Sequence, residues 1–257
     1  MLKVKKYIYF IIILTLMFSC ISNKKIAYFQ YDSIDDKKVT NNYVTIFKPD
    51  DLLQIMVSAK DMLSVKPFNL SVVNYSGSTN GVIGEPQQQE YLIDSKGEID
   101  FPILGKIKLG GLTREQAITL IKKKLDPLHV KNPSINIRIT NFTVTVTGDV
   151  RSPNSFLIRN ERVSIIDAIG LAGDLNITGR RDNVSVIREE NNTKKIYRVN
   201  LLSKKTYTSP VFYLQQNDII YVEHNKAKIQ SASYNQNTGL FISIGSILIS
   251  LMSVLIR

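Results

Sequence analysis

The chain is poor in the residues that build disulfide frameworks and local metal sites. It has one cysteine, two histidines and no tryptophan among its 257 residues. A single cysteine cannot form an internal disulfide, so a disulfide-stapled scaffold is excluded. His129 and His224 lie far apart and have no partners at metal-ligand spacing. We therefore expect no metal and no cofactor.

Long apolar runs occur only at the two ends of the chain, which excludes a protein with many membrane spans. Hydrophobic residues make up 44% and charged residues 21% of the sequence, values that are ordinary for a folded protein. The length predicts one or two domains.

Positive charge exceeds negative charge but is not concentrated. Lys and Arg number 33 against 22 Asp and Glu, giving a formal net charge of +11. The one tight run, Lys122–Lys124, falls late in a predicted helix, where positive charge suits the helix dipole. Because no aromatic residues interleave with it, we interpret it as a solvated helix face and predict no nucleic-acid binding.

Motifs for catalysis are also missing. Paired carboxylates occur at 35–36, 50–51 and 189–190, but adjacent residues in turns or polar segments need not face one target. No phosphate-cradling glycine loop and no nucleophile motif occurs. We predict that the protein is not an enzyme, with a secreted hydrolase as a distant alternative.

The N-terminus carries a targeting signal. Three lysines precede an almost wholly apolar run over residues 7–18, and Ser19 stands directly before Cys20. This order is typical of a secretory signal peptide, and the run is shorter than the about 20 residues of a membrane span. It resembles a bacterial lipoprotein signal, which predicts a signal peptide over 1–19 and lipidation, with palmitate, at Cys20. The alternative is an uncleaved N-terminal anchor.

A second membrane signal lies at the C-terminus. Residues 240–256 carry no charge and are followed by Arg257. A helix of this length measures about 25 Å, which is short for a typical core of about 30 Å, although the bacterial outer membrane is thinner than average. We predict a C-terminal membrane-spanning helix over 240–256.

Serines form a narrow stripe on this predicted helix. Ser243, Ser246, Ser250 and Ser253 are spaced three, four and three residues apart, so they fall within about 80° of one another. Small hydroxyl side chains allow helices to pack closely, or they could face a wet lumen in a ring of helices. The alternative is a simple tail anchor whose serines bond back to their own helix.

Between the two ends, the sequence predicts two small α+β domains. The first, 43–140, opens with an alternating strand over 43–47 and contains a helix that begins at a Thr113 capping box. A hairpin is predicted from Tyr91–Ile93 and Glu98–Phe101. The second domain, 141–225, has its own strands and a short helix that begins at a Ser164 capping box.

Three further segments connect these parts. Residues 20–42 have no sustained period and are interpreted as a lipidated tether. Residues 60–90 contain several glycines and three consecutive glutamines, which predicts a long loop or insertion. Residues 226–239 are interpreted as a linker to the C-terminal helix.

Short motifs occur in a fixed order along the middle of the chain. Residues 43–57 include Pro49-Asp50-Asp51-Leu52, and residues 91–139 include Phe101-Pro102 and Gly111-Leu-Thr-Arg-Glu115. Residues 142–222 include Val146-x-Gly148-x-Val150-x-x-Pro153, Asp167-Ala-Ile169-x-x-Ala172-Gly173 and Leu214-x-x-x-Asp218-x-Ile220-x-Val222. Together they resemble the polysaccharide export family of outer-membrane lipoproteins.

Two positions depart from the family pattern. Asp50 and Asn217 stand where glycine is usual. Asp and Asn tolerate a positive φ better than other non-glycine residues, so both turns can form. Only one β-grasp unit is visible, whereas well-known members have more.

The resemblance implies an architecture and a role. It implies a polysaccharide export domain, one soluble-ligand-binding β-grasp domain and a homo-oligomeric ring forming a porin-like channel for capsular or exopolysaccharide. Lipids and C-terminal helices would lie in the outer membrane of a Gram-negative bacterium, with the globular domains in the periplasm. The implied partner is an inner-membrane polysaccharide co-polymerase, and the serine stripe would face the lumen or a neighbouring helix. The alternative is a lipid-anchored periplasmic scaffold or sugar-binding module that forms no pore.

Overall fold

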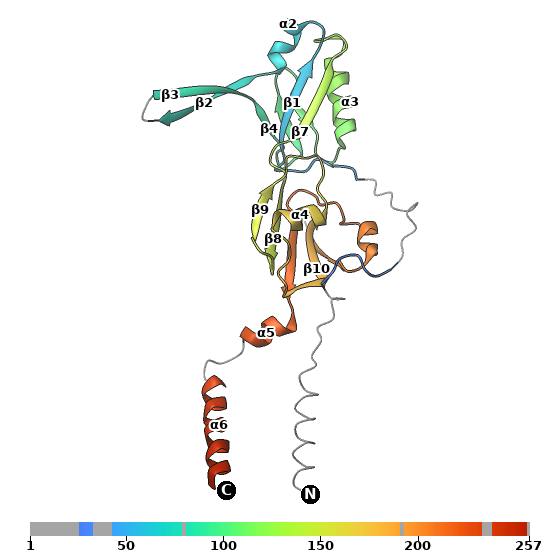
Figure 1. Ribbon diagram of the computed structural model, residues 1–257. Coiled ribbons are helices and arrows are strands. Elements are labelled where there is room, and N and C mark those ends of the chain that lie inside the picture. Colours follow the sequence, from blue (N-terminus) through green and yellow to red (C-terminus); the bar gives the residue numbers. More distant parts are fainter. Residues whose placement is uncertain (1–25, 33–42, 79–80, 191–192, 233–237, 256–257) are drawn as a thin grey trace.

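The computed structural model describes residues 26–32, 43–78, 81–190, 193–232 and 238–255. They form two domains stacked end to end, each with its own hydrophobic core, followed by two helices that leave the second domain (Figure 1). The mixed helix and strand content predicted from the sequence is confirmed.

The first domain is built on a three-stranded antiparallel sheet with β1 (Leu52–Ser58) at its centre. Its neighbours are β4 (Glu90–Leu92) and β7 (Ser134–Ile139). Helix α3 (Arg114–Leu125) packs against this sheet through three side chains that are fully buried: Ala117, Ile121 and Leu125. The capping box predicted at Thr113 is present, so the sequence located the start of this helix correctly.

Shorter elements complete the first domain. They are helix α2 (Met62–Val65), the 3₁₀ helix η3 (Lys66–Phe68), and the strands β5 (Glu98–Phe101) and β6 (Gly105–Lys108).

The strand predicted over residues 43–47 is wrong. This segment is extended but makes only one isolated bridge, between Ile46 and Thr113. Phe47 is the one side chain of the segment that is buried, while Val44 and Ile46 are about half exposed. The segment crosses the boundary between the two domains, where no neighbouring strand is present to complete a sheet.

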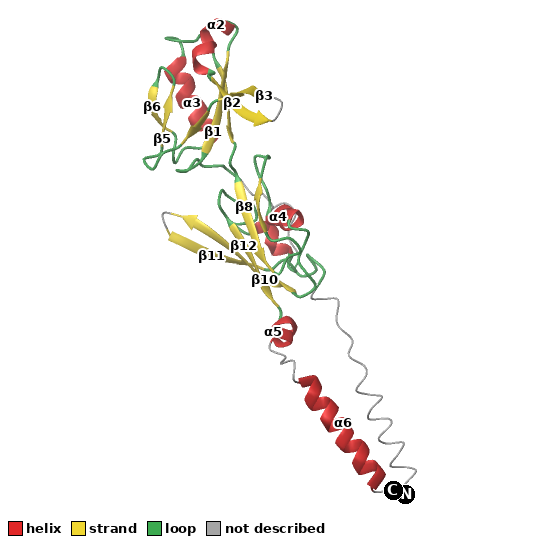
Figure 2. Ribbon diagram, turned by 90° about the vertical axis from the view of Figure 1, so that its left-hand side faces the viewer, coloured by secondary structure: helices red, strands yellow, loops and turns green. Residues whose placement is uncertain are grey.

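Residues 60–90 were predicted to be a long loop or an insertion, and the loop is wrong. Most of it forms an antiparallel hairpin of β2 (Ser71–Ser78) and β3 (Gly81–Gln88), which projects away from the first domain (Figures 1 and 2). The sequence does not predict these strands because Pro86 and the glycines are unusual in strands. Both strands lie at edges, however, where a proline is tolerated.

The hairpin predicted from Tyr91–Ile93 and Glu98–Phe101 is half right. The turn exists, with the Asp94 N–H donating to the Glu98 carbonyl at 2.8 Å. The flanking strands nevertheless belong to different sheets, because β4 pairs with β1 whereas β5 pairs with β6.

The second domain contains a five-stranded sheet in the order β11-β10-β12-β8-β9. Strands β8 and β12 are parallel and every other pair in this sheet is antiparallel. Helix α4 (Ile165–Leu171) begins at the predicted Ser164 capping box. The remaining elements are β8 (Thr143–Gly148), β9 (Asn154–Leu157), β10 (Gly179–Glu190), β11 (Thr193–Val199), the 3₁₀ helix η4 (Lys204–Thr208) and β12 (Ile219–His224).

The two turns in which glycine is replaced form as expected. Asp50 has a φ of 69° and Asn217 a φ of 64°, both in the left-handed region. A glycine is required at one nearby position, Gly148, where β8 ends against β12. Its φ is 93°, and a Cβ added there would lie 2.1 Å from the Val222 carbonyl oxygen.

A buried ion pair fixes the loop that precedes β12. The Arg188 guanidinium donates from Nε to Asp218 Oδ1 at 3.0 Å and from Nη2 to Asp218 Oδ2 at 2.7 Å. Both side chains are at most 5% exposed. Arg188 also donates to the Tyr213 carbonyl, and Asp218 accepts from the Gln215 N–H. The pair therefore ties β10 to residues 213–218.

Part of the predicted tether is folded. Residues 26–32 pack on the second domain, where the Phe29 N–H donates to the Leu201 carbonyl and the Tyr31 N–H to the Leu202 carbonyl, both at 3.0 Å. The Phe29 ring stacks on Tyr207 with 4.7 Å between ring centroids. Partly buried aromatic rings hold the segment there. Over so few residues they produce no hydrophobic period in the sequence.

Helices α5 (Lys226–Ala232) and α6 (Thr238–Leu255) follow the second domain. Within the residues that the structure describes, none of the helices combines the length and apolarity that a membrane crossing needs. The membrane-spanning helix predicted over 240–256 is therefore not supported, although residues 240–255 are helical. The 18 residues of α6 rise about 27 Å, less than the about 30 Å of a typical bilayer core.

Replacing Asp218 tests the buried ion pair. We expect Asp218→Ala to lower the free energy of unfolding by about 3–5 kcal/mol, because it leaves the Arg188 charge buried without its partner. Urea denaturation of the purified protein, followed by circular dichroism, measures the change. Asp182→Ala removes a half-exposed partner of Arg180 and should cost only about 0–1 kcal/mol. Equal losses in the two variants would contradict this assignment.

Candidate functional site

The chain passes between the domains through a short linker that is fixed by side-chain amides. Asn141 Nδ2 donates to the Asp50 carbonyl and its Oδ1 accepts from the Leu52 N–H, both at 2.9 Å. Gln216 Nε2 donates to the Asn141 carbonyl at 2.8 Å, and its Oε1 accepts from the Thr143 N–H at 2.7 Å. The Asn141 amide thus binds backbone groups of the first domain, and the Gln216 amide binds the linker and the start of β8.

Further contacts join the domains on either side of this linker. Lys48 Nζ donates to Gln215 Oε1 at 2.9 Å, and Arg114 forms an ion pair with Glu161. Ile139, at the end of β7, packs against both hydrophobic cores. The domain boundary is therefore bridged by polar and apolar contacts.

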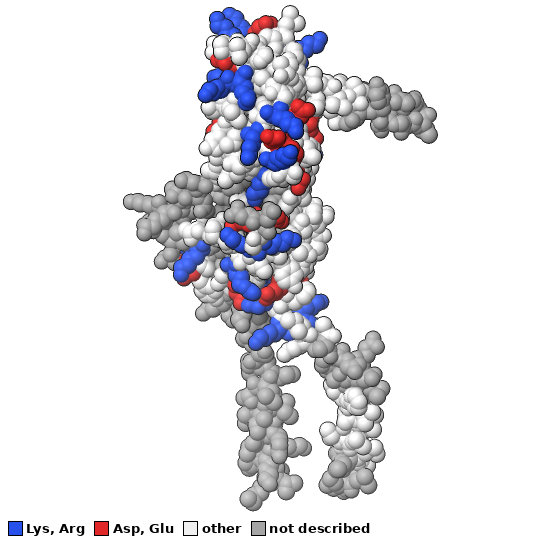
Figure 3. Space-filling model, turned by 180° about the vertical axis from the view of Figure 1, so that it is seen from behind, with Lys and Arg blue, Asp and Glu red and all other residues white. Residues whose placement is uncertain are grey.

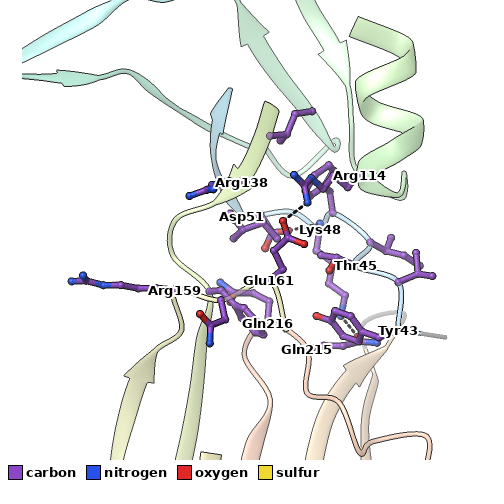
Figure 4. Close-up of a pocket in the computed structure, with 17 residues that line it drawn as sticks. Tyr43, Thr45, Lys48, Asp51, Arg114, Arg138, Arg159, Glu161, Gln215 and Gln216 are labelled. Carbon is purple, nitrogen blue, oxygen red and sulfur yellow. Dashed lines mark hydrogen bonds and ion pairs between the residues drawn. The ribbon is translucent and has the colours of Figure 1, made fainter. Parts of the chain in front are cut away.

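These contacts enclose a cavity of about 420 Å³ between the domains (Figure 4). This volume lies within the range of about 300–1,000 Å³ that is typical of small-molecule sites. An adjoining hollow shares its Tyr43–Thr45 wall and the Arg114–Glu161 pair. The main lining is the following: residues 43–48, Asp51, Arg114, residues 137–139, Phe142, residues 159–161, Gln215 and Gln216.

Asp51 is the buried carboxylate of this cavity. Only 1% of the residue is exposed. Its Oδ2 accepts from the Lys48 N–H at 2.8 Å, whereas Oδ1 is buried and has no hydrogen-bond partner among the described residues. Burial raises the pKa of Asp51 to about 6, against the lowering effect of the Lys48 N–H.

The charged side chains of the cavity are mostly positive. Lys48, Arg114, Arg138 and Arg159 line it together with two carboxylates, Asp51 and Glu161. Arg138 and Arg159 are exposed and extend to the same side of the cavity (Figure 4). Neither guanidinium forms an ion pair or a hydrogen bond with another described residue. Elsewhere the cations are interspersed with acids over both domains, as Figure 3 shows for one face.

The comparisons with known proteins bear on this two-domain arrangement. A family model described as polysaccharide biosynthesis/export protein matches residues 39–140. A model of the SLBB domain matches residues 143–222, so the two models meet at the linker that holds Asn141. Residues 39–140 therefore belong to the polysaccharide export family, and residues 143–222 form an SLBB domain. The resemblance inferred from short sequence motifs is thereby confirmed.

Two curated relatives come from species of the genus Ralstonia. The chain is 28% identical over 109 residues to the EPS I polysaccharide export outer membrane protein EpsA of Ralstonia solanacearum, covering 41% of this chain and 29% of that protein. It is 29% identical over 98 residues to the EpsA protein of Ralstonia nicotianae, covering 37% of this chain and 26% of that protein. The chain therefore spans less than a third of the length of the relatives it matches.

None of the site residues predicted from the sequence lines the cavity as the structure describes it. Cys20 lies outside the described residues. Ser243 and Ser246 are exposed on α6, where each hydroxyl donates to a carbonyl of its own helix, that of Gly239 or Ser243, at 2.8 Å. Ser250 is exposed as well, and the side chain of Ser253 lies outside the described part. The function of this stripe stays a prediction.

No sequence pattern indicates the cavity directly. Its polar residues come from segments far apart in the chain. Gln215 and Gln216 precede β12, whose sequence pattern is apolar and does not indicate a polar site. The pair Asp50-Asp51 predicts a solvated turn, and for Asp51 this prediction is wrong because the residue is buried. Within the described ranges, no group of three or more potential ligands could hold a metal ion.

Replacing Asp51 tests its burial. A pKa raised from 3.8 to about 6 means that folding favours the protonated carboxyl, so this contribution to stability is present below pH 4 and lost as the pH rises through 6. We expect Asp51→Asn to raise the free energy of unfolding at pH 7 by up to about 3 kcal/mol and to leave it unchanged near pH 3.5. Denaturation curves at several pH values measure this difference. Asp50→Asn changes the same charge on the exposed neighbour and should show no such pH dependence; equal behaviour of both variants would refute the assignment.

Proposed function

We propose that this protein conducts capsular or exopolysaccharide across the outer membrane of a Gram-negative bacterium as an oligomeric channel. The observation that carries the proposal is the order of the two domains, an export domain followed directly by an SLBB domain over residues 39–222. The curated relatives are named as polysaccharide export outer membrane proteins, which supports the same role and location. In this role the protein binds and moves a polymer and performs no chemistry.

Assembly into a ring of identical subunits is supported by surfaces that a single copy leaves uncovered. Helix α6 stands apart from both domains (Figures 1 and 2). Its apolar side chains are largely exposed, among them Phe241 at 69% and Ile249 at 73%. Contiguous apolar surface of this kind marks contact with another protein or with lipid. We propose that the α6 helices of neighbouring copies meet along the serine stripe or enclose a lumen with it.

Lipidation of Cys20 is the proposed means of attachment to the outer membrane, with the globular domains in the periplasm. The far end of the molecule, the first domain with its β2–β3 arm, is then free to meet an inner-membrane polysaccharide co-polymerase. The alternative is a lipid-anchored periplasmic scaffold or sugar-binding module that forms no pore.

Native mass spectrometry of the detergent-extracted protein tests assembly and lipidation together. We expect a closed ring whose subunits each carry a lipid adduct, because cleavage before Cys20 leaves a cysteine that can be acylated. Cys20→Ala should lose the adduct. A protein that stays monomeric in several gentle detergents, and that leaves planar bilayers sealed, would favour the scaffold. An adduct that persists in Cys20→Ala would show that lipidation at this residue is wrong.

Bulky substitutions in the serine stripe test the proposed role of α6. We expect Ser246→Phe combined with Ser250→Phe to reduce surface polysaccharide severely while both globular domains stay folded, because large side chains block either a lumen or a close helix contact. Surface glycan is measured on whole cells, and folding by circular dichroism. Leu248→Phe, about 180° from the stripe, is the matched control and should export normally. Normal export by the double variant would count against both roles of the stripe.

A further inference from the structure

The cavity between the domains has the polar groups of a ligand site. Its groups without a partner among the described residues are mainly donors: the exposed guanidiniums of Arg138 and Arg159 and the buried Nε of Arg114. Such a set suits an oxygen-rich ligand that carries negative charge. One acceptor, Asp51 Oδ1, is buried without a hydrogen-bond partner among the described residues. A buried carboxylate oxygen in this state requires a donor, and a ligand hydroxyl can supply it.

The remaining wall of the cavity is apolar or aromatic. Tyr43, Phe47, Ile137, Ile139 and Phe142 contribute to it. A compact inorganic anion would leave this surface and Asp51 Oδ1 unused, and an apolar molecule would leave the cations unpaired. A ligand with a carboxylate, several hydroxyl groups and ring carbons satisfies all three demands. That combination describes an acidic sugar.

We propose that the cavity between the export domain and the SLBB domain binds an acidic saccharide unit, such as a uronic acid residue. Arg138 and Arg159, which extend to one side of the cavity, hold the carboxylate, while Asp51 Oδ1 accepts from a sugar hydroxyl (Figure 4). Because the lining comes from both domains, an occupied cavity joins them more tightly. That the saccharide belongs to the exported polymer rests on the proposed function; the binding itself does not.

Isothermal titration of the purified full-length protein with tri-galacturonate tests this site. We expect saturable binding of tri-galacturonate and none of maltotriose, which has hydroxyls but no carboxylate. The double variant R138A/R159A should bind at least about tenfold more weakly, because it removes two charge-assisted donors. K123A/K124A, on the exposed face of α3, removes the same charge elsewhere and should bind as the unchanged protein does.

Several outcomes would overturn the proposal. Equal binding of maltotriose would remove the role of the arginines, and displacement by inorganic phosphate at similar concentration would show a general anion site. Absence of binding, or an unaltered affinity in R138A/R159A, would show that the cavity is not a saccharide site. Circular dichroism confirms that the variants are folded, which is expected because both arginines are exposed. Bilayer conductance is measured separately, so failure of the channel leaves a positive titration standing.

Discussion

The linker between the domains is the constraint on which the rest of the molecule depends. A chain that passes from β7 to β8 through a few residues could hinge freely, but here Asn141 caps the Asp50 turn and Gln216 holds the linker backbone from the other side. Gln216 in turn is placed by the loop that the Arg188–Asp218 pair fixes. A buried ion pair inside one domain therefore governs how that domain meets the other.

The same arrangement explains why a buried carboxylate is tolerated at the boundary. Asp51 follows the tight turn at Asp50, and its carboxylate closes that turn by accepting from the Lys48 N–H. The turn places the carboxylate in the wall of the cavity between the domains, where burial raises its pKa. The hydrogen bond within the turn therefore lowers the pKa of Asp51, whereas burial between the domains raises it.

Features encoded over a few residues could be predicted from the sequence, whereas features that depend on distant partners could not. Both capping boxes, at Thr113 and Ser164, and both left-handed turns lie where local chemistry placed them. The segment 43–47 alternates like a strand, yet it has no neighbouring strand to pair with. The β2–β3 hairpin shows the opposite case: its strands pair regularly, although their composition is typical of a loop. The cavity could not be predicted because stretches far apart in the chain build it, and the motifs that contain Asp51 and Arg114 do not indicate that these residues meet.

The docking of residues 26–32 on the second domain would limit the distance between that domain and the lipid proposed on Cys20. With a lipid on Cys20, six peptide steps separate the acylated residue from Ile26, and a fully extended chain of that length spans at most about 22 Å. The face formed by Leu201, Leu202 and Tyr207 is then held close beneath the bilayer, at the end of the molecule from which α5 and α6 leave. In the proposed role, this short connection would give the protein a fixed orientation, with the SLBB domain next to the membrane and the export domain pointing away from it.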